Sequence, residues 1–142
     1  MKRVGTEEIC RHADVISLHV PLTVHAKNMI HREHLMQMKS DAMIINTSRG
    51  GTIHELDLDE VINGVHLRGV AIDVFEQVPY TGVLAQIERC MLASHMGPMS
   101  VDCRTSMEIE ATEEEVRFLI GQTLQGVVPP EEYNIQKQGA SI

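Results

Sequence analysis

The sequence has few aromatic residues and no long apolar run. It contains no tryptophan, two phenylalanines and two tyrosines among 142 residues, too few for a surface on which nucleic-acid bases stack. No run reaches the roughly 18 apolar residues that a transmembrane helix requires. The N-terminal stretch MKRVGTEEIC has no apolar core of the kind found in secretory signals. We therefore expect a cytoplasmic protein without a membrane-spanning segment.

Basic residues are also scarce relative to acidic ones. The chain has 12 lysines and arginines against 20 aspartates and glutamates, which gives a formal net charge of −8. An acidic surface disfavours nucleic acid and anionic membrane as partners. The same charge is typical of an ordinary solubilising surface. The composition therefore predicts no nucleic-acid partner and no membrane partner.

Motifs for disulfides and metals are missing as well. Cys10, Cys90 and Cys103 are an odd set without a CxxC pair, which favours reduced thiols over a disulfide framework. His31 and His34 lie three residues apart, but no third ligand follows at a suitable spacing and there is no HExxH motif. We expect no metal site.

The glycines do not form a phosphate-binding turn. Ten are present, yet neither GxGxxG nor GxxxxGK[ST] occurs. Such a turn lets backbone amides at a helix N-terminus approach a pyrophosphate. The chain therefore lacks the usual pyrophosphate-binding part of a dinucleotide site.

What the sequence does contain is an alternation of helical and β-rich segments. It predicts helices at 6–13, 31–39, 54–63 and 100–124, and strands at 14–20, 42–48, 67–75 and 89–95. This order indicates an α/β fold, with a parallel sheet flanked by helices and a long C-terminal helix. We expect one domain over residues 1–128 and a flexible tail over 129–142, because Pro129-Pro130 ends regular structure.

Two segments carry specific burial predictions. The run AMIINTS, residues 42–48, is nearly continuously apolar, which is typical of a strand covered on both faces. In the long helix at 100–124, the acidic residues mark one wet face. Its apolar residues predict a buried side formed by Ile109, Val116, Leu119, Ile120 and Leu124.

Three residues stand where predicted strands end, the edge at which α/β folds hold their ligands. Arg49 follows the second strand beside Gly50-Gly51 and could bind a carboxylate, although it equally fits an ordinary loop. Asp73 ends the third strand as a possible ligand acceptor or a turn cap. His95 ends the fourth strand and could exchange a proton near neutral pH, although it is one of eight histidines.

Four motifs in order give the chain a specific resemblance. The stretches ADVISLHVPLT, MIINTSRGG, GVAIDVFEQVP and SHMG closely resemble the D-isomer-specific 2-hydroxyacid dehydrogenase family, from about Thr6 to Tyr133. The resemblance implies two Rossmann-like lobes with NAD or NADP between them and a small 2-hydroxy acid as substrate. It implies that Arg49 binds the substrate carboxylate and that His95 exchanges the hydroxyl proton. It assigns cofactor-lining positions to Pro21, Thr23, Thr47, Asp73 and Gly97.

The sequence departs from the family pattern at several positions. The family usually has Glu before the proline of its DVF motif, where this chain has Val78. A carboxylate there hydrogen-bonds the catalytic histidine and stabilises its protonated form, which valine cannot do. Ser94 and Pro98 also differ from the residues usual around the histidine, and Pro98 removes a backbone N–H.

The largest departure is truncation. The substrate lobe and the glycine turn of the family precede the point where this sequence begins, so we expect a partial, half doubly wound Rossmann-like sheet. The strand at Asp14–Val20 would then form an exposed edge and favour a homo-oligomer. We expect a fragment of an NAD-dependent D-2-hydroxyacid dehydrogenase that is inactive or very weak alone. The alternative is a non-catalytic oligomerising module derived from that fold, so whether this chain is itself an enzyme stays open.

Overall fold

The computed structural model describes residues 3–64 and 66–127. They divide into two compact units, Met1–His95 and Met96–Ile142, which are described separately below. The elements in chain order are α1 (Thr6–His12), β1 (Val15–Leu18), α2 (Arg32–Gln37), β2 (Met43–Asn46), α3 (Glu55–Asn63), β3 (Gly69–Ile72), η1 (Val83–Gln86), β4 (Cys90–Leu92), η2 (Gly97–Met99) and α4 (Val101–Leu119). The expected tail at 129–142 lies outside the described residues, so that boundary stays a prediction.

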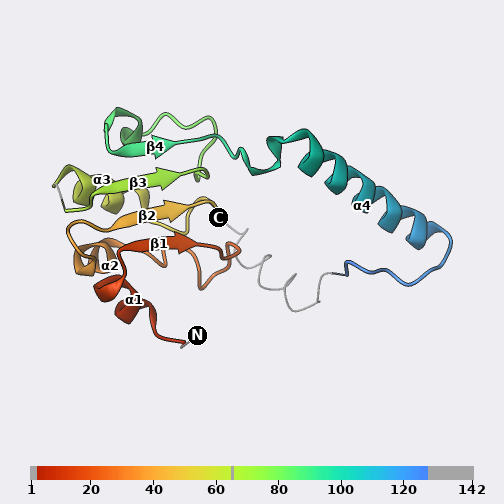
Figure 1. Cartoon of the computed structure of the whole chain (residues 1–142), viewed down its shortest axis with the longest axis horizontal. Helices are drawn as coiled ribbons and strands as arrows, with labels where there is room; N and C mark the ends of the chain where they lie inside the picture. Colours follow the sequence, from red (N-terminus) through yellow and green to blue (C-terminus); the bar gives the residue numbers. More distant parts are fainter. Residues whose placement is uncertain (1–2, 65, 128–142) are drawn as a thin grey trace. The chain divides into compact units, whose positions relative to one another are not determined.

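The first unit is built on a four-stranded parallel sheet. The strand order is β1-β2-β3-β4, so each strand pairs with its successor along the chain (Figure 1). Parallel neighbours require crossover connections, which here contain α2, α3 and η1. The predicted α/β class, with helices flanking a parallel sheet and a long C-terminal helix, is confirmed.

One face of the sheet forms the core with the helices. Along β1 and β2, buried residues alternate with more exposed ones, so one face of each strand points into the core. Because each strand is added on the same side of the one before it, right-handed crossovers place the connecting helices on one face of the sheet. Helices α1, α2 and α3 pack in series. The buried cluster includes Ile16, Leu18, Leu35, Ile44, Leu58, Ile62, Val70 and Ile72.

The opposite face of the sheet is less covered than the sequence predicts. Met43 and Ile45 of β2 are half-buried rather than buried, so the expectation of a strand covered on both faces is wrong within this unit. The same face is more exposed on the two outer strands, since Val15 of β1 and Met91 of β4 are 53% and 75% exposed. The reason is topological, because half of a doubly wound sheet supplies helices for one face.

Helices α2 and α3 are fastened together at their N-terminal ends. Asp57 accepts a 2.8 Å hydrogen bond from the Arg32 amide, and its carboxylate lies 2.9 Å from Nδ1 of His54. The guanidinium of Arg32 pairs with Glu60. Burial acts to raise the pKa of Asp57, but these hydrogen bonds and charges outweigh it and hold the pKa below its usual value.

The second unit is dominated by α4. Ser100 caps this helix by accepting a 3.2 Å hydrogen bond from the Cys103 amide. The predicted extension to residue 124 is wrong, because the helix ends at Leu119 and the chain turns at Gly121, whose φ is +72°. Glu114 then accepts hydrogen bonds from the amides of Gln125 and Gly126, which hold the return segment.

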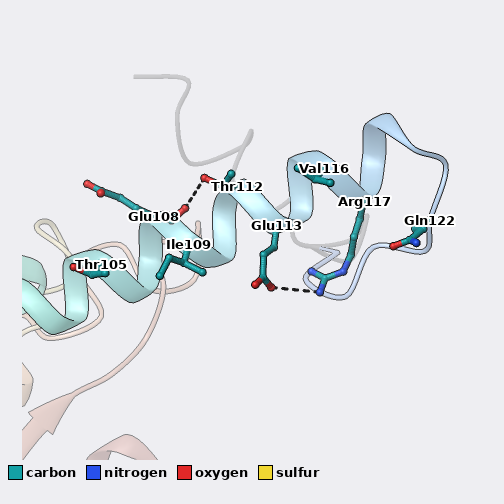
Figure 2. A pocket seen from close by; sticks show the side chains of 8 residues that line it. All are labelled: Thr105, Glu108, Ile109, Thr112, Glu113, Val116, Arg117 and Gln122. Carbon is teal, nitrogen blue, oxygen red and sulfur yellow. Dashed lines mark hydrogen bonds and ion pairs between the residues drawn. The ribbon is translucent and has the colours of Figure 1, made fainter.

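The predicted buried side of this helix is exposed. Ile109, Val116, Leu119 and Ile120 are 49–79% exposed, and Leu124 is half-buried. Figure 2 shows Ile109 and Val116 beside a shallow groove, near the ion pair between Arg117 and Glu113. Over the described part of this unit, the helix, η2 and the return segment provide no second layer to bury an apolar stripe. None of the described helices is long and apolar enough to cross a bilayer.

Candidate functional site

The carboxyl ends of β2, β3 and β4 are joined in a row by backbone hydrogen bonds. The amide of Asp73 donates to the carbonyl of Asn46 at 2.9 Å, and the amide of His95 donates to the carbonyl of Asp73 at 2.8 Å. These bonds continue the parallel ladder past the last strand residues. They fix the backbone of the two predicted site residues Asp73 and His95 side by side.

A cavity opens at this edge of the sheet. Its volume is about 580 Å³, and three of its lining residues are Arg49, Asp73 and His95. The structure thus brings together the three strand-end residues that the sequence singles out. Most of the remaining wall is apolar and consists of Val74, Phe75, Val78, Pro79, Tyr80, Ala85, Leu92 and Ala93.

The loop that carries Arg49 packs tightly on the segment after β3. Gly50 lies so close to the carbonyl group of Phe75 that a Cβ atom there would overlap it, and would come within 2.5 Å of the Glu76 nitrogen. A side chain at position 50 would therefore push the two loops apart. The close packing of the Arg49 loop on the segment after β3 depends on this glycine.

An aromatic pair forms part of the apolar wall. The rings of Phe75 and Tyr80 stack with centroids 4.1 Å apart and an interplanar angle of 22°. The Tyr80 hydroxyl accepts a 3.3 Å hydrogen bond from the Leu84 amide. Burial raises the pKa of Tyr80, a shift to which the nearby acidic side chains add and which the Leu84 hydrogen bond opposes. This pair was not predicted from the sequence, although an aromatic residue on each side of Val78 was a visible sign.

Val78 lines the cavity where the family pattern has a carboxylate. Its side chain is 80% exposed. The nearest alternative along the chain, Glu76, is not a lining residue, and its side chain lies against Gly51. Its amide donates to Glu55 at 3.1 Å. Burial raises the pKa of Glu55, and the charge of Glu76 adds to that shift. Among the described residues that line the cavity, Asp73 is thus the one acidic residue.

The remaining predicted positions do not line the cavity. Pro21 and Thr23 follow β1, and Thr23 forms a turn by accepting from the Ala26 amide through its Oγ1 at 3.2 Å. Thr47 is exposed directly after β2. These three share the carboxyl edge of the sheet with Asp73 and His95, because the strands are parallel. Gly97 belongs to the second unit.

A buried polar pair, Asn46 and Thr52, contacts the backbone of Arg49 and is not predicted as part of the site from the sequence. Asn46 and Thr52 are 2% and 0% exposed, and both hydrogen-bond the carbonyl of Arg49. The polar character of Asn46 at the end of an apolar strand was the available signal for that residue, whereas Thr52 lies in the following loop, where nothing in the sequence marks it as buried. Within the described ranges, no cluster of three or more histidine, cysteine or acidic residues could hold a metal ion.

Comparison with known proteins gives the family. Residues 1–97 match the model of the D-isomer specific 2-hydroxyacid dehydrogenase NAD-binding domain. A glyoxylate reductase of Korarchaeum cryptofilum is 32% identical over 138 residues, covering 96% of this chain and 42% of that protein. A D-3-phosphoglycerate dehydrogenase of Methanocaldococcus jannaschii is 34% identical over 122 residues, covering 85% of this chain and 23% of that protein.

Solved structures agree with the sequence matches. A glyoxylate reductase from Paecilomyes thermophila superposes with a TM-score of 0.83 at 29% identity, covering 91% of this chain and 39% of that one. An acyclic imino acid reductase in complex with NADPH and D-Arg gives a TM-score of 0.82 at 25% identity, covering 89% and 40%. The chain thus spans less than half the length of these relatives. It belongs to the D-isomer-specific 2-hydroxyacid dehydrogenase family and corresponds to part of its NAD-binding domain, whose cofactor is NAD or NADP.

Proposed function

We propose that this chain is the C-terminal part of the NAD-binding domain of an NAD-dependent D-2-hydroxyacid dehydrogenase. The intact enzyme would transfer a hydride between nicotinamide and a 2-hydroxy or 2-oxo acid. The observation that carries the proposal is that Arg49, Asp73 and His95 line one cavity at the ends of adjacent strands. Alone, the chain is expected to be inactive or very weak. We place it in the cytoplasm.

The three polar residues have complementary roles in this proposal. Arg49 offers a planar guanidinium that can hold the substrate carboxylate through two parallel hydrogen bonds. His95 exchanges a proton with the substrate hydroxyl. Asp73 accepts a hydrogen bond from the amide of the nicotinamide. When bound, NAD supplies or accepts the hydride. Pro21, Thr23, Thr47 and Gly97 are proposed to contact the cofactor, on the family resemblance.

The residues present fit one end of the cofactor. A mostly apolar cavity with an acceptor at one strand end suits the nicotinamide ring and its amide. The pyrophosphate has no matching glycine turn in the sequence. Most of the binding free energy that this turn and its helix would supply is therefore missing. We expect the affinity of the chain alone for NAD or NADP to be low.

Val78 supports the expectation of weak catalysis. General acid–base catalysis contributes roughly 10²–10⁴-fold to rates and depends on a correctly oriented group. A cavity wall in which Asp73 is the acidic member offers no carboxylate at position 78 to hold the His95 ring. Proton transfer by His95 would therefore lack the usual orienting partner.

The carboxylate site can be tested with variants of Arg49. We expect the chain to bind oxalate, a 2-oxo acid mimic, in a titration followed by ¹H–¹⁵N NMR. Arg49→Met should weaken the affinity by about tenfold or more, since a charge-assisted hydrogen bond contributes roughly 1.5–3 kcal/mol. Arg49→Lys keeps the charge, and its oxalate affinity should lie between those of the unaltered chain and Arg49→Met, because lysine cannot form the paired contact. Equal affinity in all three proteins would contradict the role of Arg49.

A second candidate function is a non-catalytic oligomerising module. Strand β1 pairs with β2 and, among the described strands, stands at the edge of the sheet. Its Val15 is 53% exposed. Unpaired edge strands invite pairing with another chain, so we propose a homo-oligomer formed along β1.

Size-exclusion chromatography with light scattering tests this oligomer. We expect the mass of a dimer or larger assembly at high micromolar concentration. Val15→Lys should shift it towards the monomer, because a lysine on an edge strand opposes strand pairing. Met91→Lys on the other edge strand is the matched control and should leave the assembly intact. A clean monomer of the unaltered chain would rule the assembly out.

A further inference from the structure

We propose that Asn46 and Thr52 are positioning residues that fix Arg49 for carboxylate binding. The inference rests on the proposed function of Arg49 and extends it to a buried pair that touches neither substrate nor cofactor. Both residues belong to the segment from β2 to α3, which carries Arg49 at its outer bend. Arg49 itself is exposed, whereas Asn46 and Thr52 are 2% and 0% exposed.

Asn46 shapes the first half of this segment. Its side-chain Oδ1 accepts two hydrogen bonds from Ser48, one from the amide at 3.1 Å and one from Oγ at 2.8 Å. This is a local turn in which an asparagine side chain replaces a backbone acceptor. Ser48 is 8% exposed, so the residue before Arg49 is held inside.

Two donors then converge on the carbonyl of Arg49. Nδ2 of Asn46 donates to it at 3.2 Å, and Oγ1 of Thr52 donates to it at 2.8 Å. Asn46 and Thr52 are themselves joined, with Nδ2 3.0 Å from Oγ1. The guanidinium of Arg49 adds a local contact by donating from Nη1 to the Ser48 carbonyl at 2.7 Å.

The pair is also tied to the sheet and to the rest of the first unit. The carbonyl of Asn46 accepts from the Asp73 amide at 2.9 Å, and the carbonyl of Thr52 accepts from the Ile30 amide at 3.2 Å. Asn46 therefore connects the backbone of one site residue, Asp73, with that of another, Arg49. Binding then orders the Arg49 side chain alone, because the backbone that carries it is already fixed, and the entropic cost of binding is smaller.

A purely structural role predicts something different. Polar side chains that are only 0–2% exposed must be hydrogen-bonded whatever their function, so loss of stability alone does not support positioning. A positioning role requires that the order of residue 49 and its affinity for a carboxylate change while the core stays folded.

The test compares Thr52→Val, Thr52→Ser and Asn46→Ala with the unaltered chain. Valine has the shape of threonine without its hydroxyl, and serine restores the hydroxyl. The readouts are the ¹H–¹⁵N heteronuclear NOE of the Arg49 amide without ligand and the dissociation constant for oxalate. Signals of Ile44 and Ile62, both buried, report whether the core is intact.

We expect Thr52→Val to lower the Arg49 NOE and weaken oxalate binding about fivefold, the loss of roughly one ordinary hydrogen bond. Thr52→Ser should recover most of the Arg49 NOE and most of the oxalate affinity. If the Asn46→Ala variant folds, its loss of NOE and of affinity should be larger than that of Thr52→Val. Unchanged NOE and affinity in Thr52→Val with an intact core would overturn the inference. Absence of oxalate binding in the unaltered chain would contradict the proposed function instead, and the ligand-free NOE would still decide whether the pair orders Arg49.

Discussion

Gly50→Ala is expected to destabilise the first unit and to separate the two loops that hold the site. The new Cβ would overlap the carbonyl group of Phe75 and crowd the Glu76 nitrogen. Backbone atoms cannot turn aside as a side chain can, so one loop must move. Overpacking typically costs about 1–3 kcal/mol. Urea unfolding should show a lower midpoint, and oxalate affinity should fall at least as far as in Arg49→Met.

Gly126→Ala is the matched control for this prediction. A Cβ at position 126 meets no atom within 4 Å, and this glycine does not have a positive φ. Its urea midpoint and oxalate affinity should match those of the unaltered chain. If Gly50→Ala keeps both quantities unchanged, the tight approach between the Arg49 loop and the segment after β3 is not a feature of the protein in solution.

Leu35→Ala should cause the largest loss of stability. Leu35 is 0% exposed and belongs to α2, which packs between α1 and α3 over the sheet. Truncating a buried leucine typically costs about 2–5 kcal/mol, since it removes apolar contacts and leaves a cavity. Thermal or urea unfolding followed by circular dichroism measures the change. That cost is a large fraction of the roughly 5–15 kcal/mol by which domains are stable.

The neighbouring residue supplies the control. Met36 follows Leu35 in the same helix, but its side chain is 50% exposed. Met36→Ala should therefore change the free energy of unfolding by a small fraction of the Leu35→Ala effect. Equal effects of the two substitutions would show that α2 does not present Leu35 to the core in solution.

The order and type of the elements in the first unit could be predicted from the sequence. Apolar runs such as the one around Ile44 are bounded by turns and alternate with helical spacing, so local pattern and global fold agree. The observed strands are shorter than predicted, with β2 covering Met43–Asn46 rather than 42–48. A strand ends where its backbone pairing with the neighbouring strands ends, and the sequence pattern does not show that position.

Exposure on the second sheet face and along α4 could not be predicted. Periodicity shows that Ile109 and Val116 share a stripe, but not whether another element covers it. The same limit applies to Met43 and Ile45. Their exposure depends on whether helices cover the second face of the sheet, which the pattern within the strand does not show. Amphipathic pattern describes a segment, whereas burial depends on its neighbours.

For the candidate site, sequence predicted the residues at strand ends but not what holds them. Arg49, Asp73 and His95 were expected to meet because parallel strands end at one edge, and they line one cavity. The converging hydrogen bonds from Asn46 and Thr52 depend on a tertiary turn. The contact between Gly50 and Phe75 joins two loops 25 residues apart, which no local pattern encodes.

The most direct test of the central claim is a map of the residues that respond to oxalate in the ¹⁵N-labelled chain. We expect the largest changes at the amides of Arg49, Asp73 and His95 and in the loops that join them. We expect little change at Ile62 in the core or at Ile109 in α4. Saturable changes confined to α4, or none at millimolar oxalate, would contradict the claim that this chain retains the carboxylate-binding edge of a dehydrogenase.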